Sequence, residues 1–405
     1  MYGLIGEKLG HSFSKTIHEH LWAQRYDMLP MDRTELDRFL RERSFDGVNV
    51  TIPYKRTVMP YCDVIDEKAQ AIGCVNTLVC RDGRLVGYNT DFDGLSYCLD
   101  RAGISLQGKR LLILGSGSTS LTVRAVAKAR GVAEITVVSR AGEVNYENVY
   151  DRTDPQVIIN ATPVGMWPNV TGRPVDLRRF AHLEAVADVV YNPLRTELVL
   201  QAEELGLPVT GGLPMLVVQA VYAARQFCGR TFPQEETEAT IRLVERQQCN
   251  IVLIGMPGSG KTSVGQALAE LSGRELVDID SEIVRRAGCS IPQIFAQEGE
   301  AGFRRREAEV IAQAASEGGK ILSTGGGAPL SEENRHALRR SGRVYFLQRE
   351  LDLLPTEGRP LSQAAQSLAA MYEARLPFYT ACADVTVDNN GPLADTAAHI
   401  WRDFL

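Results

Sequence analysis

Short apolar runs alternate with amphipathic segments along the first half of the chain. Residues 47–51, 111–114, 157–160 and 186–190 are apolar runs of strand length, and helical periodicity is clearest over residues 213–227. Strand-like segments that alternate with helix-like ones are typical of a doubly wound sheet of parallel strands. We therefore expect an α/β fold in this half.

A hairpin signal lies near the beginning of the chain. Residues 75–80 and 84–88 are strand-like and flank Asp82-Gly83, a dipeptide that favours the tight turn between antiparallel strands. Helices are predicted at residues 15–25 and 35–43.

A second α/β pattern begins after a short polar segment, residues 246–250. The apolar strand that starts at Ile251 runs into residues 255–262, GMPGSGKT, which form a complete GxxxxGK[ST] motif before a helix. In such a loop the backbone N–H groups surround phosphates, the lysine (here Lys261) reaches the β- and γ-phosphates, and the hydroxyl of Thr262 holds Mg²⁺. The sequence therefore predicts a P-loop kinase that uses ATP and Mg²⁺.

Composition and charge exclude several classes of function. With 405 residues, the chain is too long for one core and suits two or three domains. The formal net charge of −6 and a pI of about 5.7 argue against a nucleic-acid partner, which would need a basic face. No apolar stretch approaches the roughly 20 residues of a membrane-spanning helix, no basic leader precedes the first strand, and the eight cysteines include no C-x-x-C pair. We expect a soluble, cytoplasmic protein without a membrane partner.

Two carboxylates follow the second predicted strand of the kinase half. Asp278 and Asp280 are expected at the ligand side of the sheet, although one of them could instead cap the helix that starts near Ser281. With the P-loop and the motifs that come after it, they resemble shikimate kinase over nearly all of residues 250–405. The later motifs are Gly299-Glu300, Phe303-Arg304, Glu307, Gly325-Gly326-Gly327 and Arg359-Pro360-Leu361.

The resemblance to shikimate kinase implies a role for each of these residues. Asp280 would hold the ring hydroxyls of shikimate, while Arg304 and Arg375 would clamp its carboxylate, for which a planar guanidinium is a suitable donor. Gly326 would bring backbone close to the ring, and Arg359 would neutralise charge on the transferred phosphoryl group from a lid. Lys261, Asp280 and Arg359 are then the catalytic residues. The implied ATP site consists of Gly258, Ser259, Gly260, Lys261, Thr262, Ser263 and Arg359, and the implied metal site of Thr262 and Asp278.

Polar residues also follow the predicted strands of the first half. Ser12 and Ser14 precede a helix, Lys55 follows a strand and a turn, and Asp91 lies at a strand-to-helix junction. Taken singly, Ser14 and Asp91 could be helix caps, and Lys55 a solvated surface residue. In this order, and with further segments, they resemble shikimate dehydrogenase across residues 1 to about 245. The further segments are residues 75–78, 160–166, 191–193 and 212–219.

That second resemblance implies a substrate site for 3-dehydroshikimate and shikimate. Lys55 and Asp91 would act as a catalytic pair: a cation beside the reacting ketone can stabilise the developing alkoxide or deliver its proton, and the sequence leaves both roles open. The carboxylate of the substrate would bind Ser12 and Ser14. The remaining contacts would come from Thr51, Asn76, Asp91, Tyr191 and Gln219.

The expected cofactor loop is Gly115-Ser116-Gly117-Ser118-Thr119-Ser120, between a strand and a helix. Ser118 stands where the family usually has glycine; if that position needs a positive φ, serine costs roughly 1–2 kcal/mol. Ser120 stands where Gly or Ala is usual. After the next strand, Ser139 precedes Arg140, and an arginine there suits the 2′-phosphate of NADP, whereas an acid would bind the ribose of NAD. Gly212 completes the implied NADP site.

Two consecutive reactions are therefore predicted on one chain: NADPH-dependent reduction of 3-dehydroshikimate, then ATP-dependent phosphorylation of the shikimate 3-hydroxyl. The expected fold is α/β throughout. Residues 1–100 with 213–246 would form the dehydrogenase substrate domain, 101–212 a Rossmann-like NADP domain, and 250–405 a P-loop domain like the nucleoside-monophosphate kinases. A homodimer is compatible with the sequence. The alternatives are an NAD-dependent quinate/shikimate dehydrogenase fused to a kinase, and a non-catalytic shikimate sensor.

Overall fold

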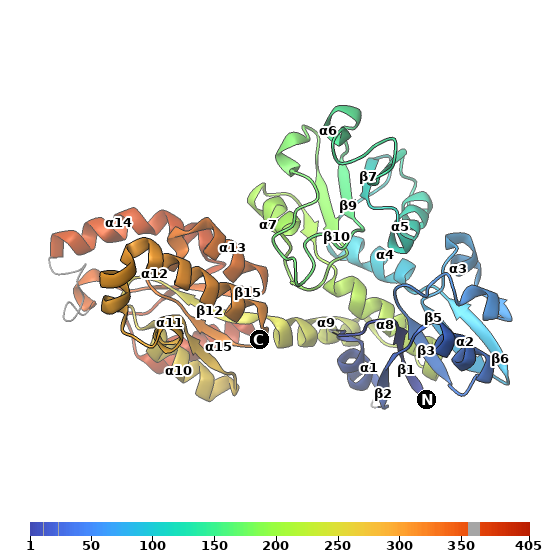
Figure 1. Cartoon of the computed structure of the whole chain (residues 1–405), viewed down its shortest axis with the longest axis horizontal. Helices are drawn as coiled ribbons and strands as arrows, with labels where there is room; N and C mark the ends of the chain where they lie inside the picture. The colour runs from blue at the N-terminus through green and yellow to red at the C-terminus, as the bar shows by residue number, and fades with distance from the viewer. Residues whose placement is uncertain (11, 23, 355–364) are drawn as a thin grey trace. The chain divides into compact units, whose positions relative to one another are not determined.

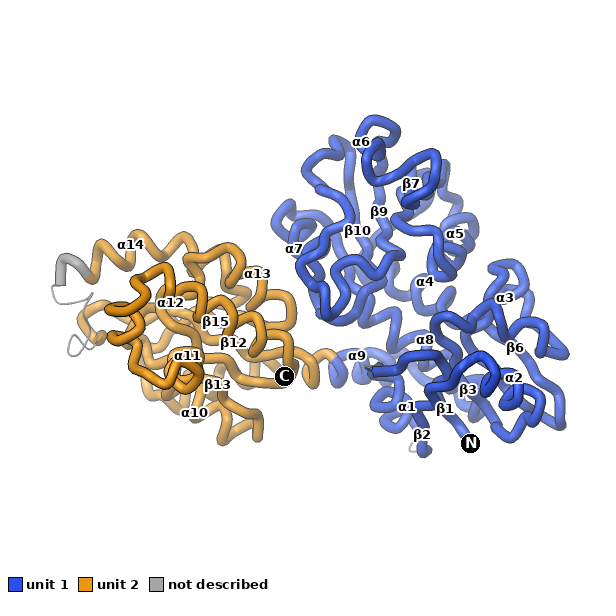
Figure 2. Tube along the Cα trace, viewed as in Figure 1, with its two compact units in different colours: residues 1–244 blue, residues 245–405 orange. Residues whose placement is uncertain are grey.

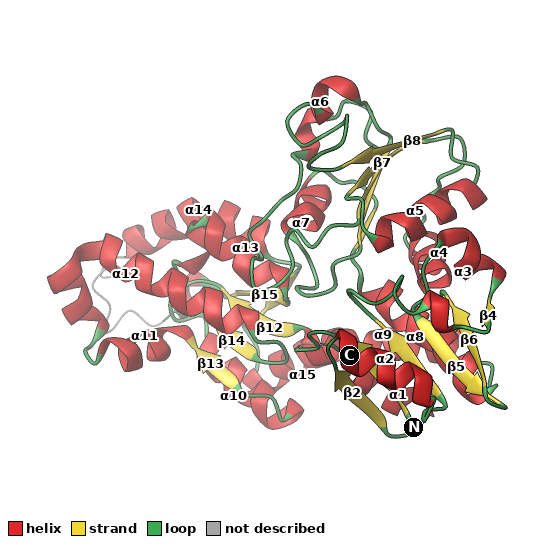
Figure 3. Ribbon diagram, turned by 45° about the vertical axis from the view of Figure 1, so that its right-hand side comes forward, coloured by secondary structure: helices red, strands yellow, loops and turns green. Residues whose placement is uncertain are grey.

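The computed structural model describes residues 1–10, 12–22, 24–354 and 365–405. The chain divides into two compact units, residues 1–244 and 245–405 (Figure 2). Within the described ranges the strands form three sheets, two in the first unit and one in the second (Figure 3). All three have helices against their faces, as expected of an α/β protein.

The first sheet is mixed and has the strand order β2-β1-β3-β5-β6-β4. β1 pairs in parallel with β2 and β3, but β5 is antiparallel to both β3 and β6. The predicted hairpin is confirmed: Asp82 and Gly83 join β5 to β6 with φ values of 51° and 72°. The hairpin reverses the chain, so this sheet is not parallel throughout. Its elements are β1 (Tyr2–Gly6), α1 (Ser14–Trp22), β2 (Tyr26–Pro30), α2 (Arg33–Glu42), β3 (Gly47–Val50), η1 (Met59–Tyr61), β4 (Val64–Ile65), α3 (Glu67–Ile72), β5 (Thr77–Arg81) and β6 (Arg84–Tyr88).

The second sheet is parallel, in the order β11-β10-β9-β7-β8. Alternate residues of its buried strands face opposite sides: Leu111 and Ile113 pack with α4 and α5, whereas Leu112 and Leu114 pack with α6 and α7. Such two-sided burial explains why these strands are continuous apolar runs. The elements are α4 (Asp91–Arg101), β7 (Arg110–Leu114), α5 (Ser118–Ala129), β8 (Glu134–Val138), α6 (Val149–Arg152), β9 (Val157–Asn160), η2 (Leu177–Arg179), β10 (Ala185–Asp188), α7 (Glu197–Glu204) and β11 (Val209–Thr210).

Two helices follow the second sheet, α8 (Leu213–Cys228) and α9 (Gln234–Gln248). α8 returns to pack with α1 and α4, so it joins the part of the unit that carries the first sheet (Figure 1). The polar segment predicted at residues 246–250 is not a loop, because α9 continues to Gln248 and the next strand starts at Asn250.

The second unit contains a parallel sheet in the order β13-β14-β12-β15-β16. β12 therefore lies in the middle of the sheet, and the P-loop leaves from its carboxyl end. The elements are β12 (Asn250–Ile254), α10 (Lys261–Ser272), β13 (Leu276–Asp278), α11 (Ile279–Ala287), α12 (Ile291–Ser316), β14 (Ile321–Ser323), η3 (Ala328–Leu330), α13 (Glu332–Arg340), β15 (Gly342–Gln348), η4 (Leu351–Leu353), α14 (Ala365–Cys382), β16 (Val385–Asp388) and α15 (Leu393–Phe404).

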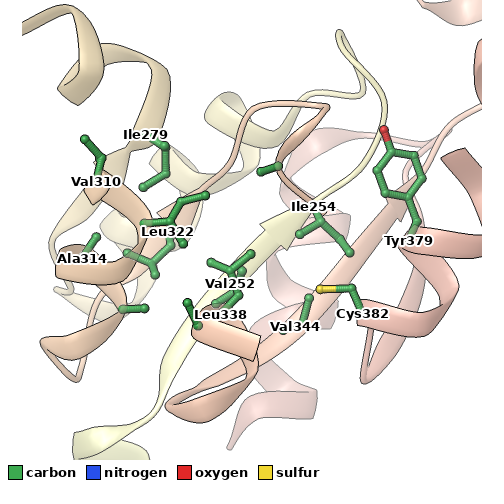
Figure 4. Close-up of a cluster of buried hydrophobic side chains, with 14 of the residues drawn as sticks. Val252, Ile254, Ile279, Val310, Ala314, Leu322, Leu338, Val344, Tyr379 and Cys382 are labelled. Carbon is green, nitrogen blue, oxygen red and sulfur yellow. The ribbon is translucent and has the colours of Figure 1, made fainter. Parts of the chain in front are cut away.

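Both faces of this third sheet are buried under helices. Val252 and Ile254 of β12 pack with side chains of α11 to α14, such as Leu338 and Tyr379 (Figure 4). On the other face, Ile251 and its neighbours pack with α10 and α15. Within the described part of the chain, no helix combines the length and the apolar composition that crossing a bilayer would require.

Candidate active sites

A cavity of about 270 Å³ in the first unit is lined by residues from both of its sheets. From the first sheet come loop residues such as Ser12 and Lys55, and from the second come Thr119, Thr162 and Val190. The structure brings together all the residues expected to contact the substrate of the dehydrogenase. These are Ser12, Ser14, Thr51, Lys55, Asn76, Asp91, Tyr191 and Gln219.

Lys55 and Asp91 form an ion pair inside this cavity. Lys55 Nζ lies 2.6 Å from Asp91 Oδ2, and the two side chains are 15% and 9% exposed. Lys55 follows β3, and its backbone is fixed by a hydrogen bond from Val75 N to Lys55 O. Asp91 is the first residue of α4 and is preceded by Thr90 at the N-cap position. Neither simpler interpretation applies: Lys55 is not a solvated surface residue, and Asp91 does not cap the helix.

The start of α4 is tied to the first sheet by buried amide and hydroxyl groups. Asn76 accepts a hydrogen bond from Thr90 N at 2.8 Å and donates to Thr90 Oγ1 at 3.0 Å. Asn89 donates to Cys74 O at 3.0 Å. These contacts hold Asp91 at the end of the sheet where Lys55 lies, so Asn76 positions the ion pair as well as lining the cavity.

The two serines lie at the start of α1 and bind each other. Ser12 Oγ accepts from Ser14 N at 3.2 Å and donates to Ser14 Oγ at 3.0 Å. Ser12 therefore satisfies the first turn of the helix, while both hydroxyls line the cavity. Ser14 itself is not the cap considered from the sequence, because it is the first residue of α1 and its N–H is bound by Ser12.

Gln219 reaches the same cavity from α8, which crosses α4 very closely. A Cβ on Gly94 of α4 would lie 2.7 Å from Met215 O and 3.2 Å from Gln219 Cβ. Gly94 is thus required for the approach of the two helices. The crossing places Gln219 within the same wall as Asp91, one turn before Gly94.

The loop expected to hold the dinucleotide joins β7 to α5. Gly115 has a φ of 103°, and a Cβ there would lie 2.7 Å from Thr162 Cγ2, so glycine is needed. Gly117 has open space around its Cα and precedes the helix. Ser118 is the first helical residue and has no positive φ, so the strain considered for this serine does not arise. This glycine-containing loop at a helix N-terminus fits the pyrophosphate of a dinucleotide.

The other residues expected to bind the cofactor surround this loop. Ser120 lies in the first turn of α5 and is buried. Thr119 and Gly212 line the 270 Å³ cavity, whereas Ser116 lies in the loop outside it. Ser139 and Arg140 follow β8; Ser139 N donates to Val144 O, and the exposed Arg140 forms no ion pair with the residues that the structure describes.

A buried carboxylate that the sequence did not single out lies behind this site. Asp188, at the end of β10, accepts from Asn160 Nδ2 at 2.9 Å, Val190 N at 3.0 Å and Thr196 Oγ1 at 2.7 Å. Burial raises the pKa of Asp188 from 3.8 to about 6, and the three donors oppose this change. Asp188 links the ends of β9 and β10 and so supports Val190 and Tyr191, which line the cavity.

In the second unit, the P-loop lies at one side of a cavity of about 830 Å³. Lys261 Nζ donates to Gly255 O at 3.0 Å and to Met256 O at 2.8 Å, so the lysine is held across its own loop. Gly258, Gly260, Lys261, Thr262 and Ser263 line the cavity, whereas Ser259 is buried beneath it. The predicted P-loop residues are therefore brought together, with Ser259 in a supporting position.

Asp278 caps a helix and also contacts the P-loop. Its Oδ1 accepts from Ser281 N at 3.0 Å, and its Oδ2 accepts from Thr262 Oγ1 at 2.8 Å. The residue that the sequence left open as a cap is therefore Asp278. A hydroxyl and a carboxylate at this distance are the oxygen ligands that suit Mg²⁺.

Asp280, Arg304 and a buried glutamate meet on the far side of the cavity. Arg304 Nη1 lies 2.7 Å from Glu307 Oε2. A Cβ on Gly325 would be 2.9 Å from Asp280 Oδ1 and 3.0 Å from Glu307 Oε1, so both carboxylates border this glycine. Burial raises the pKa of Glu307, whereas Arg304 lowers it.

Arg375 and Gly326 also lie in this cavity. Arg375 Nη1 donates to Gly326 O at 3.2 Å, and Tyr379 OH donates to the same oxygen at 2.6 Å. Tyr379, which the sequence did not single out, thus fixes the glycine loop from α14. Arg359, expected on the lid, lies outside the described residues.

Comparisons with known proteins agree with both sites. Residues 257–404 match the family profile of shikimate kinase, and residues 4–78 match that of the shikimate dehydrogenase substrate binding domain. The shikimate dehydrogenase (NADP(+)) of Shouchella clausii is 35% identical over 273 residues, which cover 60% of this chain and 98% of that protein. The enzyme of the same name from Clostridium perfringens is 34% identical over 244 residues, 55% of this chain and 90% of the relative.

Solved structures give the same result. A chorismate mutase/shikimate 5-dehydrogenase fusion protein from Clostridium acetobutylicum is 32% identical with a TM-score of 0.57, over 60% of this chain and 96% of that one. Shikimate 5-dehydrogenase from Thermus thermophilus, in complex with NADP(H) and shikimate, is 29% identical with a TM-score of 0.54, over 60% and 98%. The chain therefore belongs to the shikimate dehydrogenase family and carries a shikimate kinase domain after it, a fusion with both activities of the shikimate pathway.

Proposed function

We propose that the first unit reduces 3-dehydroshikimate at the cavity around Lys55 and Asp91, and that the second phosphorylates the 3-hydroxyl of the shikimate so formed. The observation that carries the first half is the shielded Lys55–Asp91 pair at 2.6 Å, inside a cavity with hydroxyl and amide groups on its walls. Ser12 and Ser14 offer two hydroxyls for the carboxylate of the substrate. Thr51, Asn76 and Gln219 would contact its ring hydroxyls, and Tyr191 would line its side.

Lys55 is placed to act on the oxygen of the ketone. When bound, NADPH supplies the hydride. The ammonium group of Lys55 would donate a hydrogen bond to the ketone oxygen and hold a proton where negative charge develops. Asp91 keeps the ammonium group oriented, and its second carboxylate oxygen can accept a hydrogen bond from the adjacent hydroxyl of the substrate.

NADP is our proposal for the dinucleotide site of this chain. Gly115 and Gly117 allow the backbone to approach a pyrophosphate, and Arg140 offers an exposed guanidinium at the end of β8 for a 2′-phosphate. The domain boundaries that follow are residues 1–100 with 213–246 for substrate binding and 101–212 for the cofactor.

In the kinase domain, residues 250–405, the two ends of the 830 Å³ cavity have different chemistry. The P-loop end would hold ATP, with Lys261 on its phosphates and Mg²⁺ on Thr262 and Asp278. At the other end, Arg304 and Arg375 would bind the carboxylate of shikimate, and Asp280 would accept the proton of the attacking hydroxyl. Arg359 would complete the charge stabilisation from the lid.

A coupled assay tests this function directly. Purified protein is given 3-dehydroshikimate, NADPH, ATP and Mg²⁺, and all products are followed by mass spectrometry. We expect shikimate 3-phosphate, with one NADPH and one ATP consumed per molecule. If shikimate accumulated and were not phosphorylated, the proposed kinase activity would be contradicted. If ATP were consumed only after shikimate was added, the proposed dehydrogenase activity would be contradicted.

A further inference from the structure

Arg349 lies against the P-loop but belongs to a different strand. It follows β15, which pairs in parallel with β12, and β12 runs directly into the P-loop. A Cβ on Gly260, the last glycine of the loop, would lie 3.7 Å from Arg349 Nη1. The guanidinium of Arg349 is therefore next to the backbone that surrounds the phosphates.

The guanidinium has no counter-ion in the described part of the chain. Arg349 Nε is shielded from solvent and has no hydrogen-bond partner among the described residues. The polar groups around it are satisfied by one another: Asn389 donates to Ser259 O at 2.6 Å and accepts from Thr396 Oγ1 at 2.8 Å. A shielded donor on a cation costs free energy while it is unpaired, so this position calls for an anionic or strongly accepting ligand.

The position of Arg349 indicates which ligand this is. Arg349 is not among the residues that line the 830 Å³ cavity at either of its ends, and it approaches the site only beside Gly260 of the P-loop. It borders the P-loop at Gly260, and such loops bind nucleotide phosphates.

We propose that Arg349 binds the nucleotide of the kinase, with its guanidinium donating charge-assisted hydrogen bonds to a phosphate group held at Gly260. The inference rests on the role of the P-loop as the nucleotide site. In this arrangement Arg349 contributes to nucleotide affinity and not to shikimate recognition.

Arg349→Ala in the full chain tests the proposal. Because a hydrogen bond to a charged group is lost, KM for ATP should rise at least about tenfold, while KM for shikimate and kcat at saturating ATP stay within about twofold. The increase in Tm caused by ADP should shrink in parallel. Arg349→Lys keeps the positive charge but lacks the planar guanidinium group. Its KM for ATP should lie between those of the wild type and Arg349→Ala.

Arg343→Ala is the matched control, because Arg343 lies on β15, the strand that ends just before Arg349, and pairs with Asp403 at 3.0 Å. It should leave the KM for ATP unchanged. A lower Tm without nucleotide, together with a full ADP-induced increase, would assign Arg349 a structural role and overturn the proposal. A wild-type protein that ADP does not stabilise would instead contradict the nucleotide role of the P-loop itself.

Discussion

Three donors converge on the carboxylate of Asp188, yet its burial dominates and its pKa is about 6. The folded protein therefore favours the protonated form more than the unfolded chain does. The contribution of Asp188 to stability is complete below pH 3.8 and is lost as the pH rises through 6. Because the pKa differs between 3.8 in the unfolded chain and about 6 in the folded protein, the free energy of unfolding falls by about 3 kcal/mol over this range.

Asp188→Asn should remove this pH dependence, because the amide is neutral throughout. Its Tm relative to the wild type should rise between about pH 3.8 and about pH 6, on top of a constant offset from the altered hydrogen bond to Thr196. The difference in Tm is measured at several pH values by thermal unfolding, with the loss of dehydrogenase activity as the signal. Parallel profiles for the two proteins over this range would show that the pKa of Asp188 is not raised in the folded protein.

Arg140 should distinguish NADPH from NADH. In Arg140→Ala, the loss of charge-assisted hydrogen bonds to the 2′-phosphate should raise KM for NADPH by about 10- to 100-fold. KM for NADH should not change. Arg124→Ala, at an exposed arginine of α5, makes the same change in net charge and should affect neither cofactor. An equal effect of both variants would remove the specific role of Arg140.

Site residues could be predicted from the sequence where they belong to a local motif whose structure is determined by neighbouring residues. The P-loop and the residues before α1 and α4 were found because each follows a strand or precedes a helix. Asp188 was missed because its donors come from residues 160 to 196, and nothing local marks an aspartate at a strand end as buried. Tyr379 was missed for the same reason: it contacts Gly326 from more than fifty positions away in the sequence.

At the scale of elements, the crossing of α4 and α8 sets the width of the dehydrogenase cavity. Gly94→Ala should force the helices apart, since the added methyl group would meet Met215 O at 2.7 Å. The clash, about 1–3 kcal/mol, exceeds the gain in helix propensity of about 1 kcal/mol. We expect a higher KM for shikimate with full kinase activity.

Ser96→Ala is the control for Gly94→Ala, since it raises the helix propensity of the same helix at a partly exposed position. It should leave KM for shikimate unchanged. If Gly94→Ala lowered kcat and the Tm but left this KM at the wild-type value, the crossing would not position Gln219.

The elements themselves were predicted best where burial is two-sided. The apolar runs at residues 111–114, 157–160 and 186–190 correspond to β7, β9 and β10. The helices predicted at residues 15–25, 35–43 and 213–227 lie within a few residues of α1, α2 and α8. β2 was missed because its residues, Tyr26–Pro30, mix polar and apolar positions at the edge of a sheet. The hairpin was predicted, but its consequence for the direction of the whole first sheet depends on pairings between distant segments.

At the scale of the whole molecule, the described residues that line each cavity all belong to one unit. The residues that line the 270 Å³ cavity lie between positions 4 and 219, and those of the 830 Å³ cavity between 257 and 375. We therefore expect complementation: Lys55→Ala mixed with Lys261→Ala should convert 3-dehydroshikimate into shikimate 3-phosphate after a lag. Each variant alone should lack one step, with dehydrogenase kcat reduced about 10²- to 10⁴-fold in Lys55→Ala.

The control is an equal mixture of the wild-type protein and a double variant that carries both Lys55→Ala and Lys261→Ala. This control contains the same concentration of each intact active site as the mixture of single variants. Conversion by the mixture is expected to reach the same end point. No shikimate 3-phosphate from the mixture, with each single activity intact, would mean that the product of one site reaches the other only within a single chain.

The hydrogen bonds of Lys261 to Gly255 O and Met256 O have a consequence for nucleotide binding. A phosphate group must compete with two carbonyl oxygens for one ammonium group, so the free energy of binding is a difference between two sets of contacts. The lysine is ordered when the protein folds, not when ATP arrives. Selectivity for a triphosphate over solvent anions then comes from displacement: only a ligand with enough charge can draw the lysine away from its own backbone.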